Sequence, residues 1–239
     1  MKLAGRVLTV LLLAGTACRP PEAPPTPVEP AVITITTTST VPTTSTTTDT
    51  REGDPTCLSR AQFGDPTQSL YVLPFPPGAR YKVTQTYCFP AGGHRNQLAY
   101  DFNMPIGAKV VAARDGTVFD IRQDSPDDGR GDGEHNFVLI QHDDGSVAFY
   151  AHLKQNGVLV ELGDLVQAGE VIALSGNSGL TGSPHLHFGV YRGMPMQEGH
   201  DVPVNFRNTD YPLDGWGGLR KGGVYEAQED PGLPSPGGH

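Results

Sequence analysis

Short apolar or alternating runs, each closed by turn residues, follow one another along most of this chain, and no window shows a long 3.6-residue hydrophobic period. The turn-forming residues of Asp143–Ser146 predict a hairpin between two such runs. Strands are expected over Tyr81–Phe89, Lys109–Ala113, Thr117–Ile121, Asn136–His142, Val147–Leu153, Glu170–Leu174 and Leu186–Tyr191, with an edge strand over Val202–Arg207 and a short one within Gly218–Ala227. We therefore expect a mostly β fold, an open antiparallel sheet or barrel-like domain with long loops.

The N-terminal residues have the features of an export signal. Lys2 and Arg6 precede the apolar run Val7–Ala14, which is too short to span a bilayer. Small residues then lead to Cys18, and the whole resembles a bacterial lipoprotein signal in which Cys18 is lipidated. Gly15 stands where leucine is usual in such signals, and secretion without a lipid is the alternative.

The segment after Cys18 lacks the apolar residues that a core needs. Arg19–Pro30 contains six prolines, and Thr34–Thr50 contains eleven threonines. Such composition cannot offset the entropy lost on ordering, so we expect a disordered tether. The predicted organisation is a signal peptide over residues 1–17, a linker over 18–55, a folded domain over 56–207 and a partly disordered C-terminal extension over 208–239.

Charge and cysteine content narrow the possible partners. The net charge of −9 and the pI near 5.2 argue against nucleic acid, which binds clustered Lys and Arg. After export, Cys57 and Cys88 remain, and an even number in an oxidising compartment predicts a disulfide. Two separate buried thiols are the alternative. Neither cysteine lies in a CxxC pair, so a thiolate zinc site is not expected.

The strongest chemical signal is the sequence His185-Leu186-His187. Side chains alternate faces along a strand, so the two imidazoles point the same way and can begin a metal site. His94, Asp101 and His152 lie upstream and supply further groups for a catalytic zinc centre. The acidic stretch Asp124–Glu134 lacks the EF-hand pattern and is expected to be a solvated loop that can rim a substrate groove.

These motifs together resemble the lysostaphin-type zinc metallopeptidases, the LytM-like peptidoglycan endopeptidases, whose fold is mostly β. The matching stretches run in the same order between Tyr81 and Val190: Gly93-His94, Asp101-Phe102, Pro105–Ala113, Asp115–Val118, Tyr150–Leu153, Gly163-Asp164, Ala168-Gly169, Gly176–Gly179 and His185–Phe188.

The resemblance implies that His94, Asp101 and His187 bind one Zn²⁺ and that His152 and His185 are the catalytic histidines. Zinc with three protein ligands keeps a position for water and lowers its pKa. His152 then transfers a proton, and His185 stabilises the oxyanion. In the family's usual motif the aspartate follows the histidine by four residues, whereas Asp101 follows His94 by seven.

The expected function is therefore a zinc metalloendopeptidase that hydrolyses peptide stems or cross-bridges of peptidoglycan. The protein is expected to be a monomer, exported and held by Cys18 on a bacterial membrane facing the periplasm or cell wall, or else secreted. The alternatives are a catalytically inactive cell-wall or divisome regulator and a secreted protease of glycine-rich host protein. His142 is expected to be structural, and His135, His200 and His239 receive no role.

Overall fold

The computed structural model describes residues 54–89, 93–131, 134–209 and 212–230. The predicted signal peptide, the lipidation at Cys18 and nearly all of the tether lie outside these residues, as does the predicted disorder of the final residues. Within the described part of the chain, no helix is long and apolar enough to cross a membrane.

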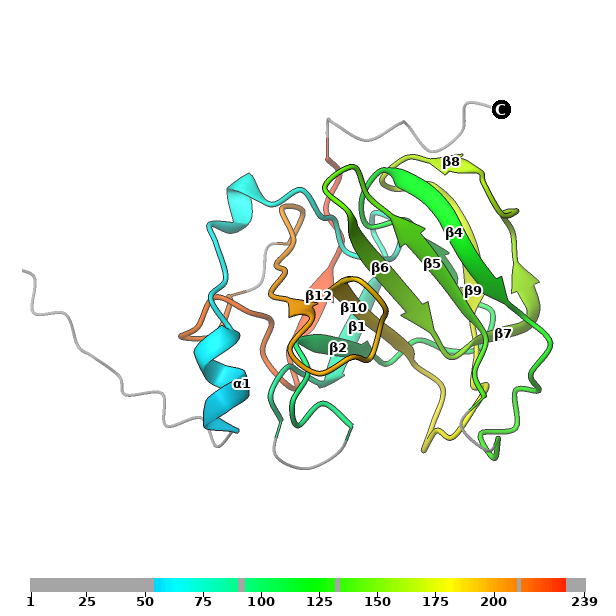
Figure 1. Ribbon diagram of the computed structural model, residues 1–239, viewed down its shortest axis with the longest axis horizontal. Coiled ribbons are helices and arrows are strands. Elements are labelled where there is room, and N and C mark those ends of the chain that lie inside the picture. Colours follow the sequence, from blue (N-terminus) through cyan, green and yellow to red (C-terminus); the bar gives the residue numbers. More distant parts are fainter. Residues whose placement is uncertain (1–53, 90–92, 132–133, 210–211, 231–239) are drawn as a thin grey trace, which may run out of the picture. The chain divides into compact units, whose positions relative to one another are not determined.

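Two short helices, which the sequence patterns did not predict, open the described chain (Figure 1). They are α1 (Pro55–Arg60) and the 3₁₀ helix η1 (Pro66–Gln68). Each follows an aspartate whose carboxylate accepts hydrogen bonds from the first backbone N–H groups, and each begins with proline, which has no N–H to satisfy. A disulfide joins Cys57 of α1 to Cys88, as predicted, and so ties this helix to the domain.

The strands form a nine-stranded and a three-stranded sheet, and every pairing is antiparallel. The large sheet has the order β12-β1-β2-β10-β6-β5-β4-β8 with β11 beside β10, and the small sheet has the order β3-β9-β7. The mostly β class predicted from the sequence is thereby confirmed. The strands of the large sheet are β1 (Arg80–Gln85), β2 (Ala99–Phe102), β4 (Gly116–Arg122), β5 (Phe137–Gln141), β6 (Ser146–Ala151), β8 (Leu165–Val166), β10 (Leu186–Arg192), β11 (Asp201–Val202) and β12 (Val224–Glu226); those of the small sheet are β3 (Lys109–Val111), β7 (Leu153–Val158) and β9 (Val171–Ser175).

Most predicted strands are present within a residue or two of their expected bounds. The exceptions are Tyr81–Phe89, which stops at Gln85, and Val202–Arg207, which contributes only β11. The predicted hairpin joins β5 to β6, and Gly145 adopts φ +75° at its tip, a conformation that favours glycine. Three strands were not expected: β2, β7 and β8.

The core lies between the two sheets. Side chains along β10 alternate between this core and the opposite face of the large sheet, where the candidate site lies. Leu186, Phe188 and Val190 are fully buried in the core, whereas Tyr191 packs in a smaller apolar cluster on the other face of the sheet. Each such buried side chain contributes about 1.5–3 kcal/mol. Because His187 has the same parity as Tyr191, the core residues of β10 fix the side of the sheet on which His187 lies.

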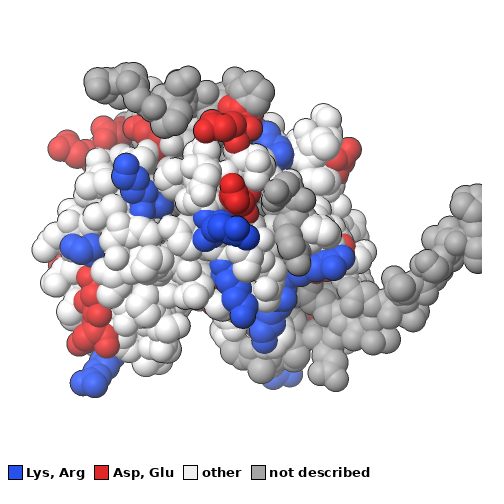
Figure 2. Space-filling model, turned by 180° about the vertical axis from the view of Figure 1, so that it is seen from behind, with Lys and Arg blue, Asp and Glu red and all other residues white. Residues whose placement is uncertain are grey.

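Charged groups of both signs occur on the face opposite to that of Figure 1. Figure 2 shows basic side chains gathered toward the lower part of this face and acidic ones toward its upper and outer edges. The charged side chains of the described residues are therefore distributed unevenly on this face.

Candidate metal centre and active-site cleft

Neighbouring strands bring His187 and Asp101 together. In the antiparallel pairing of β10 with β2, these two residues lie directly opposite each other, so their side chains share one face of the sheet. The distance from His187 Nδ1 to Asp101 Oδ1 is 3.1 Å. This pair is fixed by strand register and does not depend on a loop.

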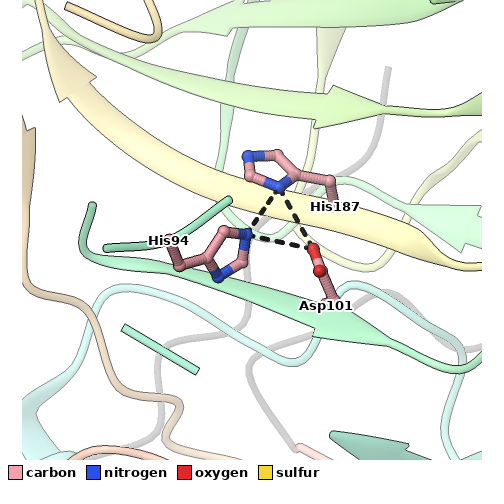
Figure 3. A group of neighbouring side chains, drawn as sticks. All are labelled: His94, Asp101 and His187. Carbon is pink, nitrogen blue, oxygen red and sulfur yellow. Dashed lines mark hydrogen bonds and ion pairs between the residues drawn. The ribbon is translucent and has the colours of Figure 1, made fainter. Parts of the chain in front are cut away.

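His94 completes a triangle of ligand atoms from the turn that precedes β2 (Figure 3). Its Nε2 lies 3.0 Å from His187 Nδ1 and 3.2 Å from Asp101 Oδ1. All three residues are buried. The longer spacing between His94 and Asp101 therefore does not prevent the two side chains from converging.

The triangle fits a bound metal ion. Two ligand atoms about 2.1 Å from zinc at a tetrahedral angle would lie about 3.4 Å apart, close to the distances seen here. Two imidazoles and one carboxylate are a donor set typical of catalytic zinc. The other ring nitrogens, His94 Nδ1 and His187 Nε2, are buried and have no hydrogen-bond partner among the described residues. The group therefore can hold a divalent cation.

The protonation states also suit metal binding. Burial alone would raise the pKa of the Asp101 carboxyl, but the neighbouring His94 and His187 outweigh it and hold this pKa well below its usual value. Burial lowers the pKa of His187 to about 4, against the opposing effect of its hydrogen bond to Asp101. At neutral pH the cluster thus contains a carboxylate and a neutral imidazole, which are the forms that coordinate metals.

His152 and His185 lie next to the triangle. Their ring centroids are 4.6 Å apart, and His185 Nε2 is 3.7 Å from Asp101 Oδ1. Burial, reinforced by His185 and His187, lowers the pKa of His152 to about 3, so its imidazole is neutral at physiological pH. All five residues named from the sequence therefore meet at one place in the described structure.

A cleft of about 470 Å³ surrounds this group. Its walls include Gln97 and Met196, whose side chains contact each other, and Leu180 and Thr181 of the loop before β10. Leu180 and Met196 are largely exposed, so apolar side chains are available to a ligand at the rim. Asp101 is the only acidic residue among the described lining residues, and none of them is Lys or Arg.

His142 and His200 lie outside the cleft. His142 is buried with Nδ1 2.7 Å from the Asp115 carbonyl oxygen, in agreement with the structural role expected for it. His200 is exposed and bonds the Arg192 carbonyl. His239 lies beyond the described residues.

Sequence analysis assigned no role to His135, yet its ring lines the cleft 5.2 Å from that of His152. A signal for this placement exists in the hairpin of β5 and β6. Its register pairs Phe137 with Ala151, so one step further toward the strand ends places Asn136 beside His152. Fixing the register from the Asp143–Ser146 turn would have found both His135 and Asn136.

Comparison with known proteins finds a family model and several relatives that are similar to this domain. Residues 95–205 match the model of Peptidase family M23, and the match begins directly after His94. An uncharacterised metalloprotease of Haemophilus influenzae is 36% identical over 138 residues, which are 58% of this chain and 26% of that protein. The peptidoglycan DD-endopeptidase ShyA of Vibrio cholerae serotype O1 is 40% identical over 97 residues, which are 40% of this chain and 20% of that protein.

Among solved structures, the catalytic domain of a variant of the prophage-encoded M23 protein EnpA from Enterococcus faecalis is 28% identical, with 55% of this chain and 97% of that one covered and a TM-score of 0.43. The match to the curated relatives spans 26% or less of their length in the first three cases. The resemblance inferred from the motifs is confirmed over residues 95–205, which match the model of Peptidase family M23.

Proposed function

We propose that this protein is a zinc-dependent metalloendopeptidase that hydrolyses peptide bonds in peptidoglycan stems or cross-bridges. The observation that carries the proposal is the buried triangle of His94 Nε2, Asp101 Oδ1 and His187 Nδ1, with edges of 3.0–3.2 Å. These residues would hold the ion. Zinc bound there would supply Lewis-acid chemistry, polarising a peptide carbonyl and acidifying a water molecule.

His152 is suited to proton transfer. Its Nδ1 lies 2.8 Å from the Ser178 carbonyl oxygen, and because a carbonyl only accepts, Nδ1 must carry the proton. The neutral ring therefore offers Nε2 as a proton acceptor to the cleft. Proton transfer of this kind contributes about 10²–10⁴-fold to a rate.

His185 has the same arrangement with a different consequence. Its Nδ1 donates to the Ser183 carbonyl oxygen at 2.8 Å, so Nε2 can donate a hydrogen bond only when the ring carries both protons. In that form, the ring would stabilise the negative charge that develops on the carbonyl oxygen during attack. The two histidines thus divide the work between accepting a proton and stabilising charge.

ShyA and ShyB of Vibrio cholerae are named peptidoglycan DD-endopeptidases, which supports peptidoglycan as the substrate. Export, with lipidation at Cys18, would bring the domain to that polymer and remains part of the proposal.

The competing hypothesis is a regulator that keeps the fold and binds a cell-wall or divisome partner without hydrolysis. Two measurements on the purified protein distinguish the endopeptidase from the regulator. Elemental analysis is expected to find one equivalent of zinc, and mass spectrometry is expected to find chelator-sensitive release of muropeptides from intact sacculi. A folded protein that neither binds zinc nor releases fragments would refute the proposal in favour of the regulator.

A further inference from the structure

His152 holds a backbone conformation that its own residue type disfavours. Its φ is +60°, in the left-handed region, at the junction between β6 and β7. A residue with a Cβ persists there only when its surroundings hold it. The position of this imidazole in the cleft therefore depends on whatever secures the junction.

Asn136 forms hydrogen bonds with the backbone of Leu153, the residue after His152. The backbone N–H of Leu153 donates to the Asn136 carbonyl oxygen at 3.1 Å, and the Asn136 side-chain amide donates to the Leu153 carbonyl oxygen at 3.1 Å. The same amide donates to the Ser125 carbonyl oxygen, and its oxygen accepts from the Ser125 N–H, both at 2.8 Å. Asn136 is completely buried, and these contacts use every polar group of its side chain.

Ser178 connects this arrangement to the ring of His152. Its hydroxyl donates to the Leu153 carbonyl oxygen at 2.7 Å and accepts from the Asn136 N–H at 2.9 Å. Its carbonyl oxygen accepts the proton on His152 Nδ1. Ser178 is also completely buried and lies in the loop that leads to β10. One residue therefore constrains both the backbone next to His152 and the tautomer of its ring.

We propose that Asn136 and Ser178 are positioning residues, which hold His152 in its left-handed backbone conformation and in the Nδ1–H tautomer so that Nε2 faces the substrate. This inference rests on the proposed function, because it assigns His152 the proton transfer. In the described structure, neither Asn136 nor Ser178 forms a hydrogen bond with His94, Asp101 or His187. Their loss should therefore affect His152 and leave metal binding intact.

The test compares Ser178→Ala with Ser175→Ala. Ser175 is equally buried, but its hydroxyl has no hydrogen-bond partner among the residues that the structure describes, so the second variant makes the same change without breaking a described contact. Ser178→Ala is expected to keep one equivalent of zinc and the wild-type KM while kcat falls about 10- to 100-fold, the range found for groups that orient active-site residues. Ser175→Ala is expected to match the wild type in zinc content, KM and kcat.

A second measurement does not require activity. The ¹⁵N chemical shifts of the His152 ring are expected to show a single Nδ1–H tautomer in the wild type and a mixture in Ser178→Ala and in Asn136→Ala. Circular dichroism identifies any variant that fails to fold. Alanine keeps the backbone carbonyl of residue 178, so the tautomer is expected to change because loss of the two hydroxyl contacts lets this carbonyl and the His152 ring move apart. The proposal is overturned if Ser178→Ala has the kcat of Ser175→Ala, if it loses zinc, or if its ring keeps the wild-type tautomer.

A wild-type protein without hydrolytic activity would refute the proposed function alone. The tautomer comparison would then still decide whether Asn136 and Ser178 orient the ring.

Discussion

The disulfide between Cys57 and Cys88 is expected to contribute a large share of the domain's stability. It closes a loop between residues 31 apart in sequence. The chain-entropy model for a loop of that size gives about 12 cal/mol/K, which is about 4 kcal/mol at 25 °C. Since a small domain has a free energy of unfolding of only about 5–15 kcal/mol, loss of the bond brings it close to the threshold of folding.

The measurement is equilibrium unfolding in urea of the wild type and of a Cys57→Ala/Cys88→Ala double variant. With a slope of about 2 kcal/mol/M, a loss of about 4 kcal/mol lowers the midpoint by about 2 M. Alanine avoids leaving a free thiol at either position, both of which are completely buried.

Reduction of the wild type provides the matched control. A thiol reductant should lower its midpoint by a similar amount and should leave the double variant unchanged. A loss below about 1 kcal/mol in the double variant would show that the bond does little to restrict the unfolded chain, and the loop-closure argument would be wrong.

Three further predictions concern the site. His187→Ala is expected to lose zinc and activity together, because it removes a ligand; elemental analysis and a muropeptide assay on the same sample check this, and a variant that retains one equivalent of zinc would contradict the assignment. His152→Ala is expected to keep zinc while kcat falls about 10²–10⁴-fold, and full activity would exclude His152 from proton transfer. The pKa values of His152 and His187 are lowered to about 3 and about 4, so as pH falls below about 6.5 the unfolded chain binds protons that the folded chain does not. The metal-free protein should therefore lose stability steadily from pH 6.5 toward pH 4 in urea titrations, and a flat profile would contradict the burial of these rings.

Sequence patterns predicted the part of the fold that alternation and turn chemistry determine locally. The hairpin of β5 and β6 followed from the residues of Asp143–Ser146, and the common face of His185 and His187 followed from strand parity. The two-residue strand β8 and the four-residue strand β2 were missed, because segments so short carry too little pattern to stand out.

The sequence predicted the residues of the candidate site but not the residues that hold them in position. His94 and Asp101 were named through the resemblance, although their spacing departs from the usual motif. Their convergence with His187 depends on the pairing of β2 with β10, a contact between segments about 86 residues apart that no local pattern reveals. The hydrogen bonds of Asn136 and Ser178 are likewise long-range, and Asn and Ser before a strand are common without any such role.

Strands β1 and β12 have a practical consequence for transferring this domain into another protein. Both lie outside the family match at 95–205, yet β1 covers the open side of β2, and Tyr225 of β12 is completely buried. A fragment cut at the limits of that match would leave the strand that bears Asp101 with unsatisfied amides along one edge, which invites self-association. Any graft of this module should therefore carry its flanking segments as well.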